Sequence, residues 1–382
     1  MRWILTLTEI FVFSIAACQA GNVEREISGL MQKYGAIGVS VAVVKDNSIV
    51  YYNSFGYKNL EDSVPLHPSD LFRIASVTKT FVVTAIMQLA EKRKLSLDDD
   101  INKYLSFRVQ NPKYPQIPIT IKMLMCHRSS INDSQGYRNF KKIVSSSGFM
   151  AEKCFSDYVP DGQFTYCNLN YNLLGAIIEN VTNMRFDKYI QKNILKPLKL
   201  RGRFNVTELD SASFVSSYWY NKEKDEFAYV SETYKPYTEV MQNYILGYSV
   251  PYLSAAGGLK ISAPELARYM MMHMNNGSYK KKKIIKKESE RQMRQVPVGN
   301  SGYALSISHY HESIIQGEEL LGQTGGAHGI HTAMIFHPEK KYGFVVFCSG
   351  CKSKSSDMDG HELNFDTIKC LYNNIILKSN ER

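Results

Sequence analysis

The chain has 382 residues, of which 44% are hydrophobic and 12% aromatic, a composition that excludes an intrinsically disordered protein and allows a large buried core. Its formal net charge is +10, but six lysines fall between Lys280 and Lys287, and the balance without them is +4. A single lysine run with no basic-aromatic module is typical of a solvated loop, so we expect no nucleic-acid binding; attraction to anionic lipid or wall polymer is the alternative.

The first twenty residues have the pattern of an export signal. Arg2 precedes an apolar stretch from Ile10 to Ala17 that ends in small residues. The segment up to Cys18 resembles a bacterial lipobox, which would make Cys18 a lipid anchor; the alternative is simple cleavage near Ala20. We therefore expect residues 1–20 to be removed, and residues 21–382 to be exported as a periplasmic or membrane-anchored domain of a bacterium.

Six cysteines follow Cys18. An oxidising compartment permits disulfides, and Cys154 with Cys167 is a candidate short-loop pair, with free thiols as the alternative. Cys348 and Cys351 form a C-x-x-C pair, for which a redox pair and half a metal site are the alternatives. We interpret them as buried free cysteines, because no second pair completes a zinc ligand set. We expect no metal and no other cofactor.

The hydrophobic pattern predicts strands near both ends of the chain and helices between them. A helix over 23–33 precedes a hairpin whose turn is at Asp46-Asn47, and Ser76 opens a mainly helical region that extends to about residue 200. Within it, Thr120 caps a short helix over 121–126, and a second helix spans 169–181. Residues 202–250 are interpreted as loops with a few short strands over a cleft.

The last third of the chain begins with a capping box at Ser262 that opens a helix reaching Met274. Strands are predicted at 303–308, 332–336 and 344–348, before a closing helix over 365–377. Because no regular strand-helix alternation demands parallel crossovers, we predict an α+β fold with an antiparallel sheet built from both termini and flanked by helices. Residues 21–75 and 255–382 would form one lobe, and residues 76–254 an inserted, mainly helical lobe.

Ser76 and Lys79 are the first candidates for chemistry. Their spacing of three residues places the hydroxyl and the amine on one helix face, where a desolvated lysine can take the serine proton. The helix N-terminus also aims free N–H groups at an oxyanion. The same spacing occurs at Ser278 and at Ser349, so the pair alone does not decide the function.

Further candidates follow in order along the chain. Tyr166 and Asn168 lie at a loop-helix junction, where a tyrosine whose pKa is lowered by a neighbouring ammonium can act as a base and an amide can bind a substrate carbonyl. Gln323, Thr324, Gly325 and Gly326 precede a predicted strand, and the Gly326 N–H is a candidate second oxyanion donor.

Taken together, these stretches resemble the serine β-lactamase-like and penicillin-binding-protein superfamily, in particular the branch of class C β-lactamases, D-alanyl-D-alanine carboxypeptidases and esterases. The resemblance covers roughly residues 25 to 375 and rests on four ordered stretches, at 72–79, 123–130, 160–175 and 256–259. It implies a β-lactamase/transpeptidase-like fold in which Ser76 is acylated, Lys79 and Tyr166 exchange protons, and Asn168 orients the substrate.

One residue departs from the pattern of that branch. Gln323 stands where lysine or histidine usually precedes Thr-Gly, and a neutral amide supplies hydrogen bonds without charge to a substrate carboxylate. His127 corresponds to a histidine common in the branch and is interpreted as structural. His328 and His331 lie near the glycine-rich segment. We expect them at the surface, and the alternative is that either one borders the cleft.

The sequence therefore predicts a monomeric, exported serine hydrolase that acts through an acyl-enzyme on an amide or ester. A D-Ala-type cell-wall peptide is the first choice of substrate, with a β-lactam or a small ester behind it. The alternative is an esterase of small esters, or a penicillin-binding sensor of the same fold that does not turn over.

Overall fold

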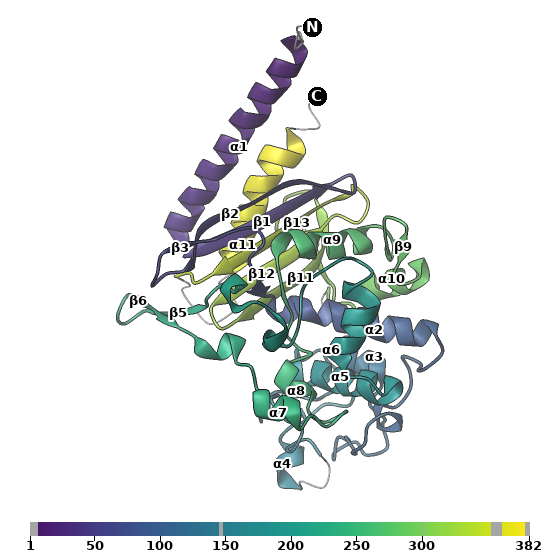
Figure 1. The fold of residues 1–382 in the computed structure, drawn as a ribbon. Helices are drawn as coiled ribbons and strands as arrows, with labels where there is room; N and C mark the ends of the chain where they lie inside the picture. The colour runs from purple at the N-terminus through teal and green to yellow at the C-terminus, as the bar shows by residue number, and fades with distance from the viewer. Residues whose placement is uncertain (1–6, 145–147, 301, 353–360, 379–382) are drawn as a thin grey trace.

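One antiparallel sheet organises the chain (Figure 1). The computed structural model describes residues 7–144, 148–300, 302–352 and 361–378. The strand order is β10-β11-β12-β13-β1-β2-β3. In chain order these strands are β1 (Gly38–Lys45), β2 (Ser48–Asn59), β3 (Val64–Pro65), β10 (Ser308–His311), β11 (Glu319–Ala327), β12 (Ile330–Phe336) and β13 (Tyr342–Ser349). The N- and C-terminal parts of the chain meet where β1 pairs antiparallel with β13, so the predicted α+β class and its sheet from both termini are confirmed.

The pairing of β1 follows from its sequence. Val39, Val41 and Val43 point to one face of the sheet, while Ala42 and Val44 point to the other, and all five are buried. The hairpin to β2 turns at Asp46 and Asn47, whose φ values of 48° and 64° are those of a type I′ turn. The hairpin and its turn are as predicted.

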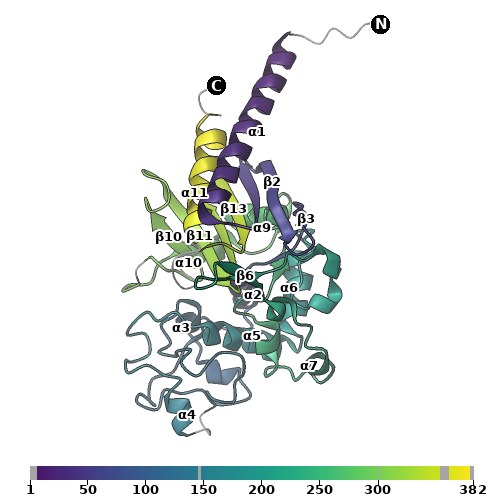
Figure 2. The same cartoon turned by 90° about the vertical axis from the view of Figure 1, so that its left-hand side faces the viewer.

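Helices cover both faces of the sheet. Helix α1 (Leu7–Tyr34) and helix α11 (His361–Leu371) lie side by side on one face, and both views show them projecting beyond it (Figures 1 and 2). Helix α9 (Ala263–Met274) covers the other face, and α2 (Thr78–Glu91) packs on it through the stacked rings of Phe81 and Tyr269. Among the described helices, none has the length and apolar character needed to cross a bilayer.

The region between the two parts of the sheet is mainly helical, and it carries most of the remaining elements. Its centre is the buried helix α5 (Asn168–Thr182), which contacts α2, α3 and α8. The short ladder of β4 (Phe72–Arg73) with β7 (Lys260–Ile261) ties the segment before Ser76 to the segment after Gly258. The other elements are α3 (Ile121–Met125), α4 (Phe149–Glu152), α6 (Phe186–Ile190), β5 (Tyr218–Asn221), β6 (Glu226–Tyr229), α7 (Thr238–Gln242), α8 (Val250–Leu253), β8 (Ser278–Tyr279), β9 (Lys282–Lys283) and α10 (Lys287–Arg294).

Two predictions outside the candidate site are wrong. The strand predicted at 303–308 begins only at Ser308, because Ser306 has a φ of 63° and the chain turns tightly where the Ala304 N–H bonds the Ile307 carbonyl. The candidate disulfide is not formed: Cys154 and Cys167 are buried free thiols. Each has its own hydrogen-bond acceptor, the carbonyl of Met150 for Cys154 and a carboxylate oxygen of Asp133 for Cys167.

Candidate active site

Ser76 lies in a 3-10 turn (Ala75–Val77) just ahead of α2. The sequence predicts that an α-helix opens at Ser76; the structure opens it at Thr78 instead. Ala75 has a φ of 44°, a left-handed conformation that costs an alanine roughly 1–2 kcal/mol. Such strain persists only where surrounding structure enforces it. Here the turn is held because the hydroxyl of Thr332, on β12, donates to the Ile74 carbonyl at 2.9 Å.

Lys79 faces Ser76 from the first turn of α2 and has no exposed surface. Its Nζ lies 3.0 Å from Ser76 Oγ, 2.8 Å from Asn168 Oδ1 and 2.8 Å from the Ala256 carbonyl oxygen. Burial lowers the pKa of Lys79 to about 7, and the negative charge of Asp133 partly opposes that shift. A substantial fraction of the amine is therefore neutral at neutral pH.

A neutral amine has two N–H donors and one lone pair, and the three partners of Lys79 suit these groups. Its two N–H groups can bond the Asn168 and Ala256 oxygens, because a carbonyl oxygen only accepts. The nitrogen lone pair is then left for the Ser76 hydroxyl. This arrangement poises Lys79 to take the serine proton.

Tyr166 approaches Ser76 from the other side. Its hydroxyl donates to Ser76 Oγ at 2.7 Å, although the residue as a whole is 40% exposed. Burial of the hydroxyl raises the pKa of Tyr166 above its usual value, so the pKa lowering predicted for this tyrosine is wrong. Because the Lys79 amine has itself lost much of its charge, it does not stabilise a phenolate. Tyr166 therefore keeps its proton and donates the hydrogen bond to Ser76 Oγ.

Asp133 organises this side of the site, and sequence reasoning missed it. One carboxylate oxygen accepts the backbone N–H and the side-chain amide of Asn168, at 2.7 and 2.9 Å, while the other accepts the Leu169 N–H at 3.0 Å. The negative charge thus lies at the positive end of α5. It fixes the Asn168 amide so that Oδ1 faces Lys79.

Strand β11 forms the opposite wall of the site. Residues Glu319 to Gly322 of β11 pair with β10. Residues Gln323 to Ala327 pair only with β12 among the described strands. The other edge of this second part of β11 is therefore free to bond an extended substrate. A Cβ on Gly325 would lie 2.7 Å from the Ile74 carbonyl oxygen and from Ser76 N. Only glycine lets β11 approach Ser76 this closely.

Gly326 is the next residue of β11 and follows Gly325 beside the turn of Ser76. The structure therefore brings together all four predicted side chains, Ser76, Lys79, Tyr166 and Asn168, and places the predicted glycine-rich segment against them.

The sequence also matches the model of a known protein family. The family model described as beta-lactamase matches residues 23–367, which is most of the chain. The chain belongs to the β-lactamase family.

The chain is also similar to curated proteins and to solved structures. "Protein flp" of Staphylococcus aureus strain MRSA252 is 33% identical over 176 residues, which are 44% of this chain and 35% of that protein. The octameric penicillin-binding protein homologue from Pyrococcus abyssi is 28% identical, with a TM-score of 0.73 over 93% of this chain and 77% of its own. The D-amino acid amidase from Ochrobactrum anthropi SV3 shares the fold, at 18% identity and a TM-score of 0.70 over 93% and 99% of the two chains. The match to the curated relative spans about a third of that relative's length.

Gln323 is the residue at which this β-lactamase-family chain departs from the pattern predicted by resemblance. Side chains alternate along a strand, so Gln323 lies on the same face of β11 as the Cβ position of Gly325, which points at Ser76 N. It is buried, and the Ser308 hydroxyl lies 3.5 Å from its Oε1. Thr324 alternates to the other face. The amide is thus packed toward the 3-10 turn Ala75–Val77, here called the catalytic turn, and it carries no charge.

The three histidines near the site have different surroundings. His127 is buried at the end of α3, where its Nδ1 accepts the Cys167 N–H at 3.1 Å and its ring packs under Tyr166, as expected of a structural residue. His328 is partly buried. His331 is 4% exposed, so the expected surface position is wrong for it, because β12 lies between β11 and β13 inside the sheet.

Proposed function

We propose that the chain is an exported serine hydrolase that acylates Ser76, with a D-Ala-type cell-wall peptide as its first substrate class. The observation that carries the proposal is the Nζ of Lys79, fully buried and 3.0 Å from Ser76 Oγ. Support for the substrate comes from neighbours described as a penicillin-binding protein homologue and as a D-amino acid amidase.

The reaction begins as Lys79 takes the Ser76 proton and Oγ attacks the carbonyl carbon. The N–H groups of Ser76 and Gly326 bind the oxyanion, and the Asn168 amide holds the substrate. Tyr166, protonated and 2.7 Å from Ser76 Oγ, passes a proton to the leaving group and is reprotonated through Lys79. Water then hydrolyses the acyl-enzyme.

Labelling tests this proposal directly. The protein is incubated with a fluorescent penicillin and with a fluorophosphonate, and intact mass and peptide mapping locate any adduct. We expect one adduct at Ser76 that is absent in Ser76→Ala and present in Ser278→Ala, which removes a serine with the same spacing to lysine. No adduct with either probe, or an adduct that persists in Ser76→Ala, would refute the proposal that the chain is a serine hydrolase acylated at Ser76.

The uncharged Gln323 favours a second candidate, a protein that acylates but releases product slowly or prefers small esters. A carboxylate-bearing substrate gains no ion pair from an amide at this position. An acyl-enzyme that survives for hours after excess penicillin is removed would support the non-turnover sensor. Release within seconds would exclude it.

Export, lipidation and oligomeric state are separate parts of the proposal. The signal-like residues before Cys18 support export, and loss of membrane association in Cys18→Ala would support a lipid anchor there. Retention of that variant in the membrane would exclude it. We propose a monomer, although the Pyrococcus homologue is described as octameric; sedimentation at several protein concentrations distinguishes the two states.

A further inference from the structure

A cavity of about 220 Å³ lies beside the catalytic turn, lined in part by charged side chains. Arg73, partly buried, and Lys260, buried, contribute from the β4–β7 ladder. Arg138 and Lys235 lie at the exposed rim. Glu232 is the single carboxylate among the described lining residues, so four basic side chains face one acid.

The positive charge of this cavity is not neutralised within the described part of the chain. The guanidinium of Arg73 has one hydrogen bond there, from Nε to the Gly257 carbonyl at 2.9 Å, and Lys260 Nζ donates to the Phe204 carbonyl at 2.7 Å. No ion pair among the described residues joins any of the four basic side chains to a carboxylate. A partly buried guanidinium without a partner anion is costly, so Arg73 is suited to bind an anionic ligand.

The ionisation of nearby groups reflects the same positive field. Burial, together with the charges of Arg73 and Arg138, lowers the pKa of His328 to about 4. Burial and the Arg73 charge also lower the pKa of Lys260 well below its usual value. Arg73 itself stays charged, because a guanidinium is not deprotonated in proteins.

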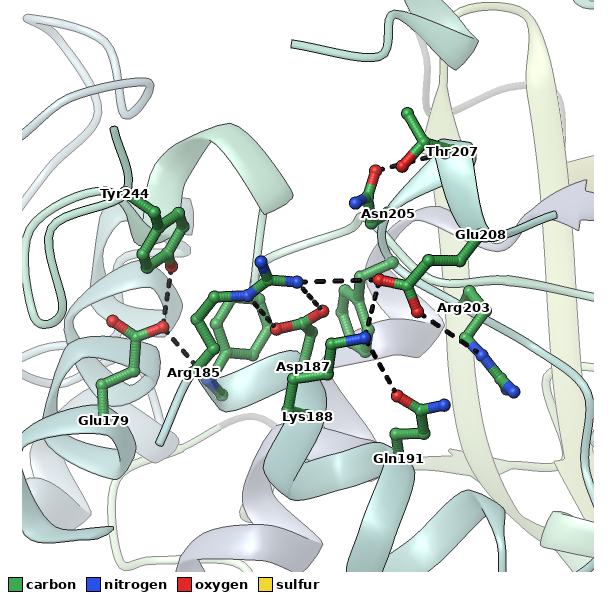
Figure 3. A network of polar contacts seen from close by, with 12 residues as sticks. Glu179, Arg185, Asp187, Lys188, Gln191, Arg203, Asn205, Thr207, Glu208 and Tyr244 are labelled. Carbon is green, nitrogen blue, oxygen red and sulfur yellow. Dashed lines mark hydrogen bonds and ion pairs between the residues drawn. The ribbon is translucent and has the colours of Figure 1, made fainter. Parts of the chain in front are cut away.

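Carboxylates on the neighbouring elements are already engaged (Figure 3). Asp187 is held by Arg185, and Glu208 by Lys188 and Arg203, at distances from 2.7 to 3.8 Å. Figure 3 shows this ion-pair network under the segment of Asn205, which lines the cavity. In the same view, Glu179 accepts the Tyr244 hydroxyl. None of these acids is left to neutralise Arg73.

Three residues that line the cavity lie close in the chain to the elements that form the site. Arg73 precedes Ser76 by three residues, and Gly258 lies two residues after Ala256, whose carbonyl accepts from Lys79. His328 directly follows Ala327, the last residue of β11. Gln323 lies toward the other end of the free edge of that strand. A substrate extended along β11 therefore has its acyl portion near His328 if its leaving group lies near Gln323 and Thr324.

We propose that this cavity binds a carboxylate carried by the acyl portion of the substrate, with Arg73 as its main partner and Arg138 and Lys235 at the rim. The planar guanidinium presents paired donors to a planar carboxylate, and the volume admits a short side chain rather than a large ligand. This inference rests on the proposed acyl-enzyme chemistry, and it specifies an anionic acyl group as the substrate class.

Two chromogenic esters test the proposal: the mono-p-nitrophenyl ester of adipic acid, and p-nitrophenyl hexanoate, whose acyl chain of equal length ends in a methyl group. The readout is the ratio of the two kcat/KM values, because damage to the fold lowers both rates together. We expect about a tenfold preference for the adipate ester in the wild type. The ratio should fall to about 1 in Arg73→Gln and fall part-way in Arg138→Gln/Lys235→Gln. Arg291→Gln, an exposed charge on α10, should keep the wild-type ratio.

A calorimetric titration with adipate makes the test independent of catalysis. We expect adipate to bind the wild type and Arg291→Gln, and to bind Arg73→Gln at least ~5-fold more weakly. A wild-type ester ratio near 1, or equal adipate binding by wild type and Arg73→Gln, would overturn the subsite. If neither ester is hydrolysed and Ser76 is not labelled, the proposed function fails, and the adipate titration alone then decides on the cavity.

Discussion

The amine of Lys79 determines how this site responds to pH. Burial lowers its pKa to about 7, so Lys79, as the proposed base, would be protonated and inactive in acid and would become neutral as the pH rises. We expect the rate of Ser76 acylation by penicillin to rise through about pH 7 and then level off, measured by stopped-flow from pH 5 to 9. In Asp133→Asn the rise should move to lower pH, because the lost negative charge had raised the lysine pKa.

Asp157→Asn is the matched control for this profile, since Asp157 is exposed and pairs with Lys113 on the surface. Its profile should coincide with that of the wild type. A rate that falls through pH 7, or an Asp133→Asn profile with an unmoved rise, would show that Lys79 is not the base.

Gln323 is the second residue with a measurable consequence. An ammonium at this position would face the catalytic turn and attract a substrate carboxylate, so Gln323→Lys should acylate with penicillin about tenfold faster. Gln316→Lys adds the same charge at an exposed position before β11 and should leave the rate unchanged. An unaltered rate in Gln323→Lys would mean that this amide does not limit the use of β-lactams.

At the scale of elements, the approach of β11 to the catalytic turn depends on Gly325. A Cβ there would lie 2.7 Å from Ser76 N, from the Ile74 carbonyl oxygen and from Thr332 Oγ1, so the strand must shift. Misplacement by a fraction of an ångström lowers rates steeply, and we expect Gly325→Ala to acylate at least ~10-fold more slowly. Stopped-flow labelling of Ser76 measures this rate.

The control for Gly325→Ala is Gly29→Ala, on α1, where an added Cβ meets nothing within 4 Å. Alanine favours a helix over glycine, so this variant should be slightly more stable and equally fast. Wild-type rates in Gly325→Ala would show that the close approach of β11 is not needed for acylation.

An element can be predicted from the sequence when the contacts that determine it are made between residues close together in the chain. The turn at Asp46-Asn47 and the Thr120 cap, whose Oγ1 accepts the Met123 N–H, are local and were predictable. Asp133 was not, because its role is to bind Asn168, 35 residues away, across a loop with no periodic pattern. The 3-10 turn at Ser76 likewise depends on Thr332, 256 residues later in the numbering, and on β11.

The fold class and the set of candidate site residues, Ser76, Lys79, Tyr166 and Asn168, were predictable for a different reason. They rest on ordered stretches that resemble a family, whereas the charges in the cavity at Arg73 come from β4, β7 and two loops that no sequence pattern joins. A tyrosine pKa was predicted in the wrong direction, since the sequence shows the neighbouring lysine but not the burial of both groups.

At the scale of the whole molecule, the buried lysine lowers stability. The pKa of Lys79 is about 7 in the folded chain against a usual value of 10.5, so between these values the unfolded chain binds more protons and stability rises with pH. From pH 6 to pH 9 the wild type should gain about 2–3 kcal/mol more than Lys79→Met. Urea unfolding at both pH values measures the difference, and Lys79→Gln serves as a second variant without the charge. Parallel pH dependences in wild type and both variants would contradict the buried, neutral lysine.

Because β1 pairs with β13, the sheet cannot be completed until the C-terminal part of the chain has been synthesised. β1 leaves the ribosome about 300 residues before its partner, an interval of ~15–60 s at ordinary rates of translation. During that interval β1 and β2 can form their hairpin, but the opposite edge of β1, with valines on both sides, has no neighbour. The nascent chain therefore exposes a strand prone to intermolecular pairing, and its yield in a cell depends on whether chaperones occupy that edge until the C-terminal strands arrive.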